Sequence, residues 1–178
     1  SLPGRVEDAQ GRGVADARVR WGHIGPENED RVAQGDAFRA DEALGSRVLR
    51  TDADGSFRID RLEQGRLLLK VEREGFSDWY RRDVNVSGEG VQPAVTVKLE
   101  GALSIRGRVG AGGTGEPLVG VWVYAEENRA GADEPQDPGR VRALVATQTA
   151  ADGSYVLDRL PPNRVKVAVW LAIGFKPQ

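Results

Sequence analysis

Few residues of this chain have the types and spacing needed for chemistry, and the first are the carboxylates of Thr51-Asp52-Ala53-Asp54-Gly55. Two Asp residues at alternating positions resemble the start of a calcium loop, but an EF-hand needs oxygen ligands over about twelve residues and a final Glu. A second segment of the same pattern, at 149–153, has Ala150 in place of the first Asp and keeps the Asp-Gly pair. Because the turn survives the loss of a carboxylate, the pattern favours a tight turn, and we predict no metal site.

Histidine-based and cysteine-based chemistry is excluded by counting. His23 is the only histidine, so one chain holds neither a Ser-His-Asp triad nor a zinc site built from histidines. The chain has no Cys, which removes thiol catalysis, disulfides and Cys-based zinc sites. We place His23 in a loop after Trp21. The carboxylates between residues 27 and 42 lie in a charged stretch without an apolar setting that would raise a pKa. We predict no catalytic residue and no cofactor.

Aromatic side chains are the best functional lead. In the segment 121–125, strand alternation directs the small apolar residues to the core and Trp122 and Tyr124 outwards. By the same alternation, Trp170 faces away from the valines of its own segment. If the two segments are neighbouring strands of one sheet, the three rings form a patch of about 450–600 Å², a size that usually marks a partner or ligand surface. The alternative is that an insertion, a missing strand or the neighbouring domain covers the patch.

Composition limits the classes of protein further. The 178 residues are 39% hydrophobic and 29% charged, which is a globular balance. A formal net charge of −2 leaves no electrostatic footprint for nucleic acid, so no nucleic-acid partner is expected. The apolar runs are far shorter than the ~20 residues that span a bilayer, so no membrane insertion is expected either.

An internal repeat supplies the elements that position these residues. Four blocks recur in the same order and with similar spacing: 4–6 as 107–109, 14–19 as 118–123, 51–62 as 149–160, and 67–71 as 165–169. Each block is short, β-branched and alternating, and turn residues separate the blocks, which predicts strands of an antiparallel sandwich. Alternation places Val165, Val167, Val169 and Leu171 on the core face of the last strand. The outward positions of the first copy that match the aromatic patch are Arg18, Arg20, Leu68 and Lys70.

The order of these motifs, from Gly4-Arg5-Val6 through the Asp-Gly turn to Gly75-Phe76 and Val97-Lys98-Leu99, resembles the carboxypeptidase regulatory-like domain. The resemblance covers nearly the whole chain as two copies, residues 1–100 and residues 101–178, joined by a short linker at 100–102 that limits relative motion. It implies an all-β fold of two tandem, Greek-key, transthyretin-like seven-stranded sandwiches, related to collagen-adhesin B-type repeats. It also implies a non-catalytic accessory or stalk role, and it says little about a ligand.

Two departures from the family pattern bear on partners. The second copy stops shortly after Gly174-Phe175, whereas the first continues to Leu99, so we expect the second sandwich to lack its last strand region. That leaves a sheet edge for pairing with another chain or with a continuation of this one. The alternatives are a chain cut at this point and a disordered tail. Insertions at 24–46 and 126–140 exceed ordinary loop lengths and are either variable loops or binding loops.

Three functions compete at this stage. The first is a non-catalytic structural or interaction module within a larger, secreted multidomain protein of the cell envelope or the extracellular space, whose partners are the flanking domains of the same polypeptide. The second is a carbohydrate-binding module, since sugar rings stack on Trp and Tyr, with a glycan or protein partner at Trp122, Tyr124 and Trp170. The third is an accessory domain of a secreted carboxypeptidase or a polysaccharide-degrading enzyme.

Overall fold

The fold is built from strands alone in the part of the chain that the computed structural model describes, residues 1–26, 44, 47–88, 90–127, 145–162 and 165–170. Within these ranges no helix is long and apolar enough to cross a membrane. The strands are β1 (Leu2–Glu7), β2 (Arg18–Ile24), β3 (Val48–Arg50), β4 (Ser56–Ile59), β5 (Gly65–Glu72), β6 (Trp79–Val86), β7 (Val95–Lys98), β8 (Leu103–Arg108), β9 (Trp122–Glu127), β10 (Val145–Gln148), β11 (Ser154–Leu160) and β12 (Val165–Trp170).

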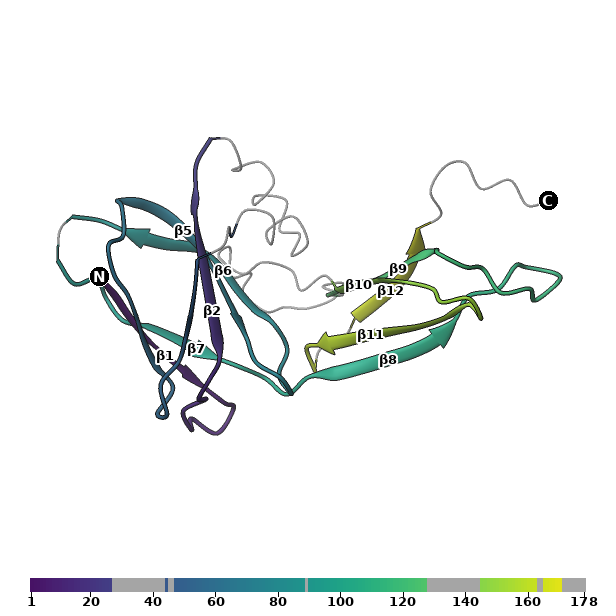
Figure 1. Cartoon of the computed structure of the whole chain (residues 1–178), viewed down its shortest axis with the longest axis horizontal. Helices are drawn as coiled ribbons and strands as arrows, with labels where there is room; N and C mark the ends of the chain where they lie inside the picture. The colour runs from purple at the N-terminus through teal and green to yellow at the C-terminus, as the bar shows by residue number, and fades with distance from the viewer. Residues whose placement is uncertain (27–43, 45–46, 89, 128–144, 163–164, 171–178) are drawn as a thin grey trace, which may run out of the picture.

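Strands β1 to β7 form two sheets in the N-terminal part, residues 1–100 (Figure 1). One sheet has the order β4-β1-β7, in which β1 pairs antiparallel with β4 and parallel with β7. The other has the order β3-β2-β5-β6 and is antiparallel throughout. Apolar residues of both sheets enclose one core, in which Val19, Leu69 and Val97 have no exposed surface. The predicted all-β, sandwich-like fold is confirmed.

Strands β8 to β12 form the C-terminal part, residues 101–178, which follows the N-terminal part along the long axis of the molecule (Figure 1). Its sheets have the orders β11-β8 and β10-β9-β12. A separate and smaller core contains Val123, Ala125, Leu157 and Leu160. Strands β9 and β12 are antiparallel neighbours, as the sequence predicted for the two aromatic segments.

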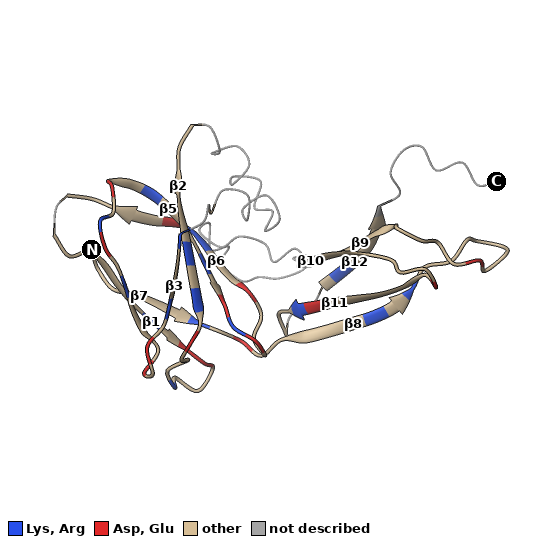
Figure 2. Cartoon of the chain, in the orientation of Figure 1, with Lys and Arg blue, Asp and Glu red and all other residues tan. Residues whose placement is uncertain are grey.

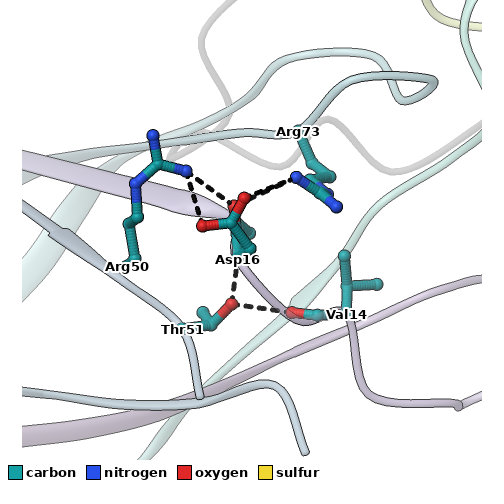
Figure 3. A network of polar contacts seen from close by, with 6 residues as sticks. Val14, Asp16, Arg50, Thr51 and Arg73 are labelled. Carbon is teal, nitrogen blue, oxygen red and sulfur yellow. Dashed lines mark hydrogen bonds and ion pairs between the residues drawn. The ribbon is translucent and has the colours of Figure 1, made fainter. Parts of the chain in front are cut away.

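The same buried threonine contact fixes the start of the second strand in both parts. Thr51 Oγ1 accepts a hydrogen bond from the Ala17 N–H at 2.9 Å and donates one to the Val14 carbonyl at 2.7 Å (Figure 3). Thr149 Oγ1 makes the equivalent contacts with the ends of the segment 118–121, at 3.0 and 2.5 Å. A buried hydroxyl that is satisfied in both directions ties two chain segments together without leaving an orphaned polar group.

Next to this contact the two parts differ in charge. Asp16 has a φ of 57°, and its carboxylate accepts from Arg50 Nη1 at 2.6 Å and Arg73 Nη1 at 2.8 Å (Figure 3). Gly120 stands at the corresponding place with a φ of 69°, a conformation that glycine adopts without strain. The N-terminal part therefore replaces a glycine by a charged residue that joins three strand ends on the surface.

Both Asp-Gly segments form tight turns, as predicted. Gly55 and Gly153 have φ values of 83° and 75°. The Asp54 carboxylate accepts from Ser56 Oγ at 2.6 Å and from the Ser56 N–H at 3.0 Å, and these hydrogen bonds hold its pKa below the usual range. The carboxylate thus closes the turn. Among the described residues, no group of three or more His, Cys, Asp or Glu side chains is placed to hold a metal ion.

Candidate functional site

The junction between the two parts is fixed by backbone hydrogen bonds. The Ser77 N–H donates to the Glu100 carbonyl at 2.9 Å, and the Ala102 N–H donates to the Gly75 carbonyl at 2.9 Å. Between these bonds, residues 76 and 101 form an isolated antiparallel bridge. The predicted linker at 100–102 is therefore held against the turn between β5 and β6. Such a linker lacks the rotational freedom of a solvated connection.

A cluster of four charged side chains lies beside this junction. Lys70 Nζ, on β5, lies 2.9 Å from Glu72 Oε1 and 3.2 Å from Asp78 Oδ2, in the turn before β6. Arg159, near the end of β11, reaches across from the C-terminal part and pairs with Asp78 through Nη2. Its Nη1 lies 3.8 Å from Glu72 Oε1. Figure 2 shows this basic tip of β11 directed towards the N-terminal part.

Burial distinguishes the cluster from an ordinary surface ion pair. The side chain of Lys70 is only 4% exposed, and those of Glu72 and Asp78 are 12% and 18% exposed. The Lys70 ammonium also lies 5.0 Å from the centre of the Tyr80 ring. Two cations and two carboxylates balance in charge. Since the penalty for burying charges is offset only when they are paired, each member depends on the others.

The pKa values follow from this arrangement. Burial by itself would lower the pKa of Lys70, but the attraction of Tyr80 and Asp78 and the hydrogen bond to Glu72 outweigh it and raise the pKa. Burial would raise the pKa of Glu72, yet the hydrogen bond and charge of Lys70 lower it. For Asp78 burial prevails and the pKa is raised. Lys70 is held as an ammonium ion, which suits an electrostatic anchor and not a nucleophile.

Lys70 and Leu68 occupy the outward positions that alternation predicted, but neither side chain is exposed. The pairing of β5 with β2 does place them on the face opposite the core, but Leu68 has no exposed surface and Lys70 is buried. Leu44, a described residue of the first insertion, is buried as well. Outward positions on this sheet are therefore buried by other residues, which alternation alone does not indicate.

The residues of the predicted aromatic face lie on β9 and β12, and β10 pairs with the other edge of β9. Trp122 is paired with Gln148 on β10 and with Trp170 on β12, so the three positions share one face. Tyr124 lies on the same face and is paired with Ala146 and Ala168. The Trp122 side chain is 39% exposed and that of Tyr124 is half-buried, whereas the side chain of Trp170 lies outside the described part of the structure.

Three further predictions have mixed outcomes. His23 lies within β2 and is half-buried, so its placement in a solvated loop was wrong. Val167 and Val169 face the core side of β12, as predicted, and remain 36% and 46% exposed. Most of the two insertions, and the whole of 171–178 with Leu171, lie outside the described residues.

The charged junction was not found from the sequence. Glu72 and Asp78 flank the turn between β5 and β6, and Arg159 belongs to a block, 158–160, that repeats 60–62. Arg61 at the repeated position makes the same local pattern, with a φ of 55° against 62° for Arg159. The two arginines differ in their surroundings, because Arg159 lies beside Glu72 and Asp78 of the other part. The one available signal was the pair of acidic residues bracketing a short turn.

One family of known domains matches the sequence of this chain. The sequence profile of the carboxypeptidase regulatory-like domain matches residues 1–100. A comparison with curated protein sequences finds no significant match. Solved structures with a similar arrangement include a streptococcal ancillary pilin, with 13% identity and a TM-score of 0.40. That alignment covers 90% of this chain and 50% of the pilin, so the chain spans half the length of that protein.

Two more solved structures are similar at the same level. The shaft pilin SpaA from Lactobacillus rhamnosus GG is 9% identical with a TM-score of 0.39, and the alignment covers 94% of this chain and 85% of the pilin. The Bacillus anthracis TIE protein is 15% identical with a TM-score of 0.35, covering 96% of this chain and 28% of that protein. At these values the likeness carries no argument about role.

Proposed function

The chain belongs to the carboxypeptidase regulatory-like domain family, and on that premise we propose that it is a non-catalytic spacer whose two sandwich units are held in a fixed relative orientation. In this proposal residues 101–178 are a second copy of the unit formed by residues 1–100. The repeated threonine contact and the repeated Asp-Gly turns support the duplication. The parent protein is then a multidomain protein of the cell surface or envelope, and the partners of this segment are its flanking domains.

The observation that carries the proposal is the junction. A flexible connection between two domains leaves their orientation free, so that distance between flanking modules is not controlled. Here the linker is hydrogen-bonded to the turn between β5 and β6, and Arg159 is paired with Asp78 and Glu72 of the other part. Backbone and side-chain contacts at the same place restrain both bending and rotation, which is the property that a spacer requires.

Spin-label distance measurements test the fixed orientation. Because the chain has no cysteine, a label pair at Arg58→Cys on β4 and Gly112→Cys in the C-terminal part needs no background substitutions. We expect one narrow distance distribution in the parent protein and a broader one after Arg159→Gln. Arg61→Gln, at the repeated position of the N-terminal part, is the matched control and should leave the distribution unchanged. A broad distribution in the parent protein would refute a spacer of fixed geometry.

A second candidate function, carbohydrate binding, is favoured by the exposure of Trp122. In the strand register Trp122 is paired with Gln148 and with position 170, and Tyr124 is paired with two alanines. An exposed aromatic ring at a position next to an amide-bearing residue suits the stacking of a sugar ring and a hydrogen bond to its hydroxyls.

Titration with oligosaccharides tests this second candidate through tryptophan fluorescence. We expect a saturable change that Trp122→Ala abolishes while leaving the fold intact. Val119→Ala is a control, since Val119 is 58% exposed in the same part of the chain. The absence of a fluorescence change across a panel of polysaccharides would remove carbohydrate binding. A large loss of stability in Trp122→Ala would show that the ring serves the core.

A further inference from the structure

Asn85-Val86-Ser87 is a motif that neither the junction nor the aromatic face uses. An amide side chain followed two residues later by a hydroxyl is the acceptor pattern of N-linked glycosylation. Of the four Asn residues in the chain, only Asn85 has Ser or Thr at that distance. Asp83 stands two positions before it, and one class of oligosaccharyltransferase also requires an acidic residue there. Since short motifs also arise by chance, the placement of this one in the fold decides its meaning.

Strand alternation presents Asn85 to solvent. Val84 and Val86 of β6 are 9% and 6% exposed and belong to the core of the N-terminal part. Asn85 lies between them in the sequence, so its side chain occupies the opposite face of the strand. Asn85 is exposed, and so is Ser87, which directly follows the strand. The amide and the hydroxyl that the motif requires are therefore both accessible on the folded chain.

The hydrogen bonds of the motif are compatible with a sugar on the amide nitrogen. Asn85 Nδ2 donates to the Asp83 carbonyl at 3.2 Å, and an amide has a second N–H that a sugar can replace without loss of this bond. The Ser87 backbone is held by Gln92, whose side chain accepts from the Ser87 N–H at 3.1 Å and donates to the Ser87 carbonyl at 3.0 Å. Within the described residues, the Ser87 hydroxyl itself makes no hydrogen bond.

The position of Asn85 along β6 separates it from the junction. In the described part of the chain, β6 is the outermost strand of the sheet β3-β2-β5-β6, and Asn85 is paired on β5 with Arg66, which is exposed as well. Asp78 precedes the first residue of β6, whereas Asn85 is next to its last residue. Residues 79 to 85 of a strand span about 20 Å, at roughly 3.3 Å per residue. A glycan on Asn85 therefore starts well away from the contact between Asp78 and Arg159.

We propose that Asn85 is the acceptor of an N-linked glycan, and that Asp83 and Ser87 are the residues by which the transferase recognises it. The proposal rests on the cell-surface location proposed above, because this modification is made on exported chains. The co-substrate is a lipid-linked oligosaccharide pyrophosphate. Asn85 Nδ2 forms a bond to the anomeric carbon of the first sugar, and the bond from that carbon to the pyrophosphate oxygen breaks. The lipid pyrophosphate leaves with the electron pair, and a base of the transferase takes the amide proton.

The test exports residues 1–178 behind an added secretion leader. The cells contain the lipid-linked donor and an oligosaccharyltransferase of the class that requires the acidic residue. We expect the intact mass of the exported chain to rise by the mass of one glycan, and peptide mapping to place that glycan on Asn85. Asn85→Gln retains an exposed amide but moves it one methylene further from the backbone, so the added mass should disappear completely.

Variants at the neighbouring positions separate the motif from exposure alone. Ser87→Ala should lose the glycan and Ser87→Thr should keep it, because the hydroxyl is required. Asp83→Asn should lose the glycan and Asp83→Glu should keep it, because the acidic charge is required. Ser104→Ala is the matched control, since Ser104 is an exposed serine on β8 without an Asn two positions before it, and the added mass should be unchanged. Thermal melts verify that each variant is folded.

Three results would overturn the proposal. The first is an unmodified chain in cells that glycosylate a control acceptor protein. The second is a glycan that persists in Asn85→Gln. The third is protein recovered from the surface of its own cells with an unmodified Asn85. Because the leader imposes export, the first result counts against the acceptor site and leaves the proposed location untouched. A broad spin-label distance distribution, in turn, counts against the spacer and leaves the acceptor site untouched.

Discussion

Replacement of Arg159 by Gln removes the charge that the C-terminal part contributes to the junction while retaining much of the side-chain stem. The variant leaves Glu72 and Asp78 with Lys70 as their only cation in the cluster. Two carboxylates that are only 12% and 18% exposed then share one positive charge. We expect the pKa of Asp78, already raised by burial, to rise further, and the C-terminal part to lose its side-chain attachment to the N-terminal part.

The expected loss of unfolding free energy follows from how exposed the side chains of this ion pair are. Solvent-exposed ion pairs contribute about 0.2–1 kcal/mol, whereas removing one partner of a buried pair costs about 3–5 kcal/mol. The Arg159 side chain is 41% exposed and its carboxylate partners are 12% and 18% exposed, which places the contact between these limits. Solvent screening on the arginine side reduces the value, so we expect Arg159→Gln to lower the free energy of unfolding by about 1–2 kcal/mol.

Urea denaturation of Arg159→Gln, Asp78→Asn and the double variant measures the coupling between the two side chains. Arg61→Gln is the control, because Arg61 occupies the repeated position with the same left-handed backbone and is exposed. It should change the free energy of unfolding by less than about 0.5 kcal/mol. Equal effects of Arg159→Gln and Arg61→Gln, or a coupling of zero in the cycle, would refute the role assigned to the junction.

Three further outcomes are expected. Thr51→Val removes a hydroxyl that bonds two backbone groups and should lower the free energy of unfolding by about 1–3 kcal/mol in urea denaturation. Gly13→Ala places a Cβ 1.9 Å from a backbone oxygen and should cost about 1–3 kcal/mol or more, whereas Gly112→Ala meets nothing within 4 Å and should be near neutral in thermal melts. Because the pKa of folded Glu72 lies below 4.5, its stabilisation is complete above that pH and is lost on acidification, so Glu72→Gln should flatten the decline in stability between about pH 5 and pH 3.

Strands and turns could be predicted from the sequence because both depend on local patterns. Alternation in 165–169 predicts which face of a strand each side chain occupies, and the structure has a strand there. The Asp-Gly pairs predict tight turns, and both glycines have the positive φ that such turns require. The pairing of β9 with β12 followed from the repeat and the family resemblance. These features need no knowledge of what lies across the core.

Burial could not be predicted in the same way. Alternation states which face a side chain occupies, but it does not state whether that face is covered. Lys70 faces outwards and is buried, while Val169 faces inwards and is 46% exposed. Lys70 contacts Glu72, Asp78 and Tyr80 of its own part, and Asp78 in turn pairs with Arg159 of the C-terminal part. Val169 has no described equivalent of β6 or β7 beside β12.

The contact of Arg159 with Asp78 could not be predicted from the sequence either. The two residues are far apart in the sequence, and nothing in the local pattern of either block separates Arg159 from Arg61. The distinction arises only from the place of the C-terminal part beside the N-terminal part. An alternating pattern is therefore informative about individual strands and silent about contacts between the two parts.

Residual dipolar couplings measured for backbone N–H groups of both parts test the fixed joint most directly. If the two parts form one rigid body, a single alignment tensor fits the couplings of β1 to β7 and of β8 to β12 together. We expect that result for the parent protein, and separate tensors of different magnitude for Arg159→Gln. Separate tensors in the parent protein would contradict the account, because they would show two units that reorient independently in spite of the contacts at the junction.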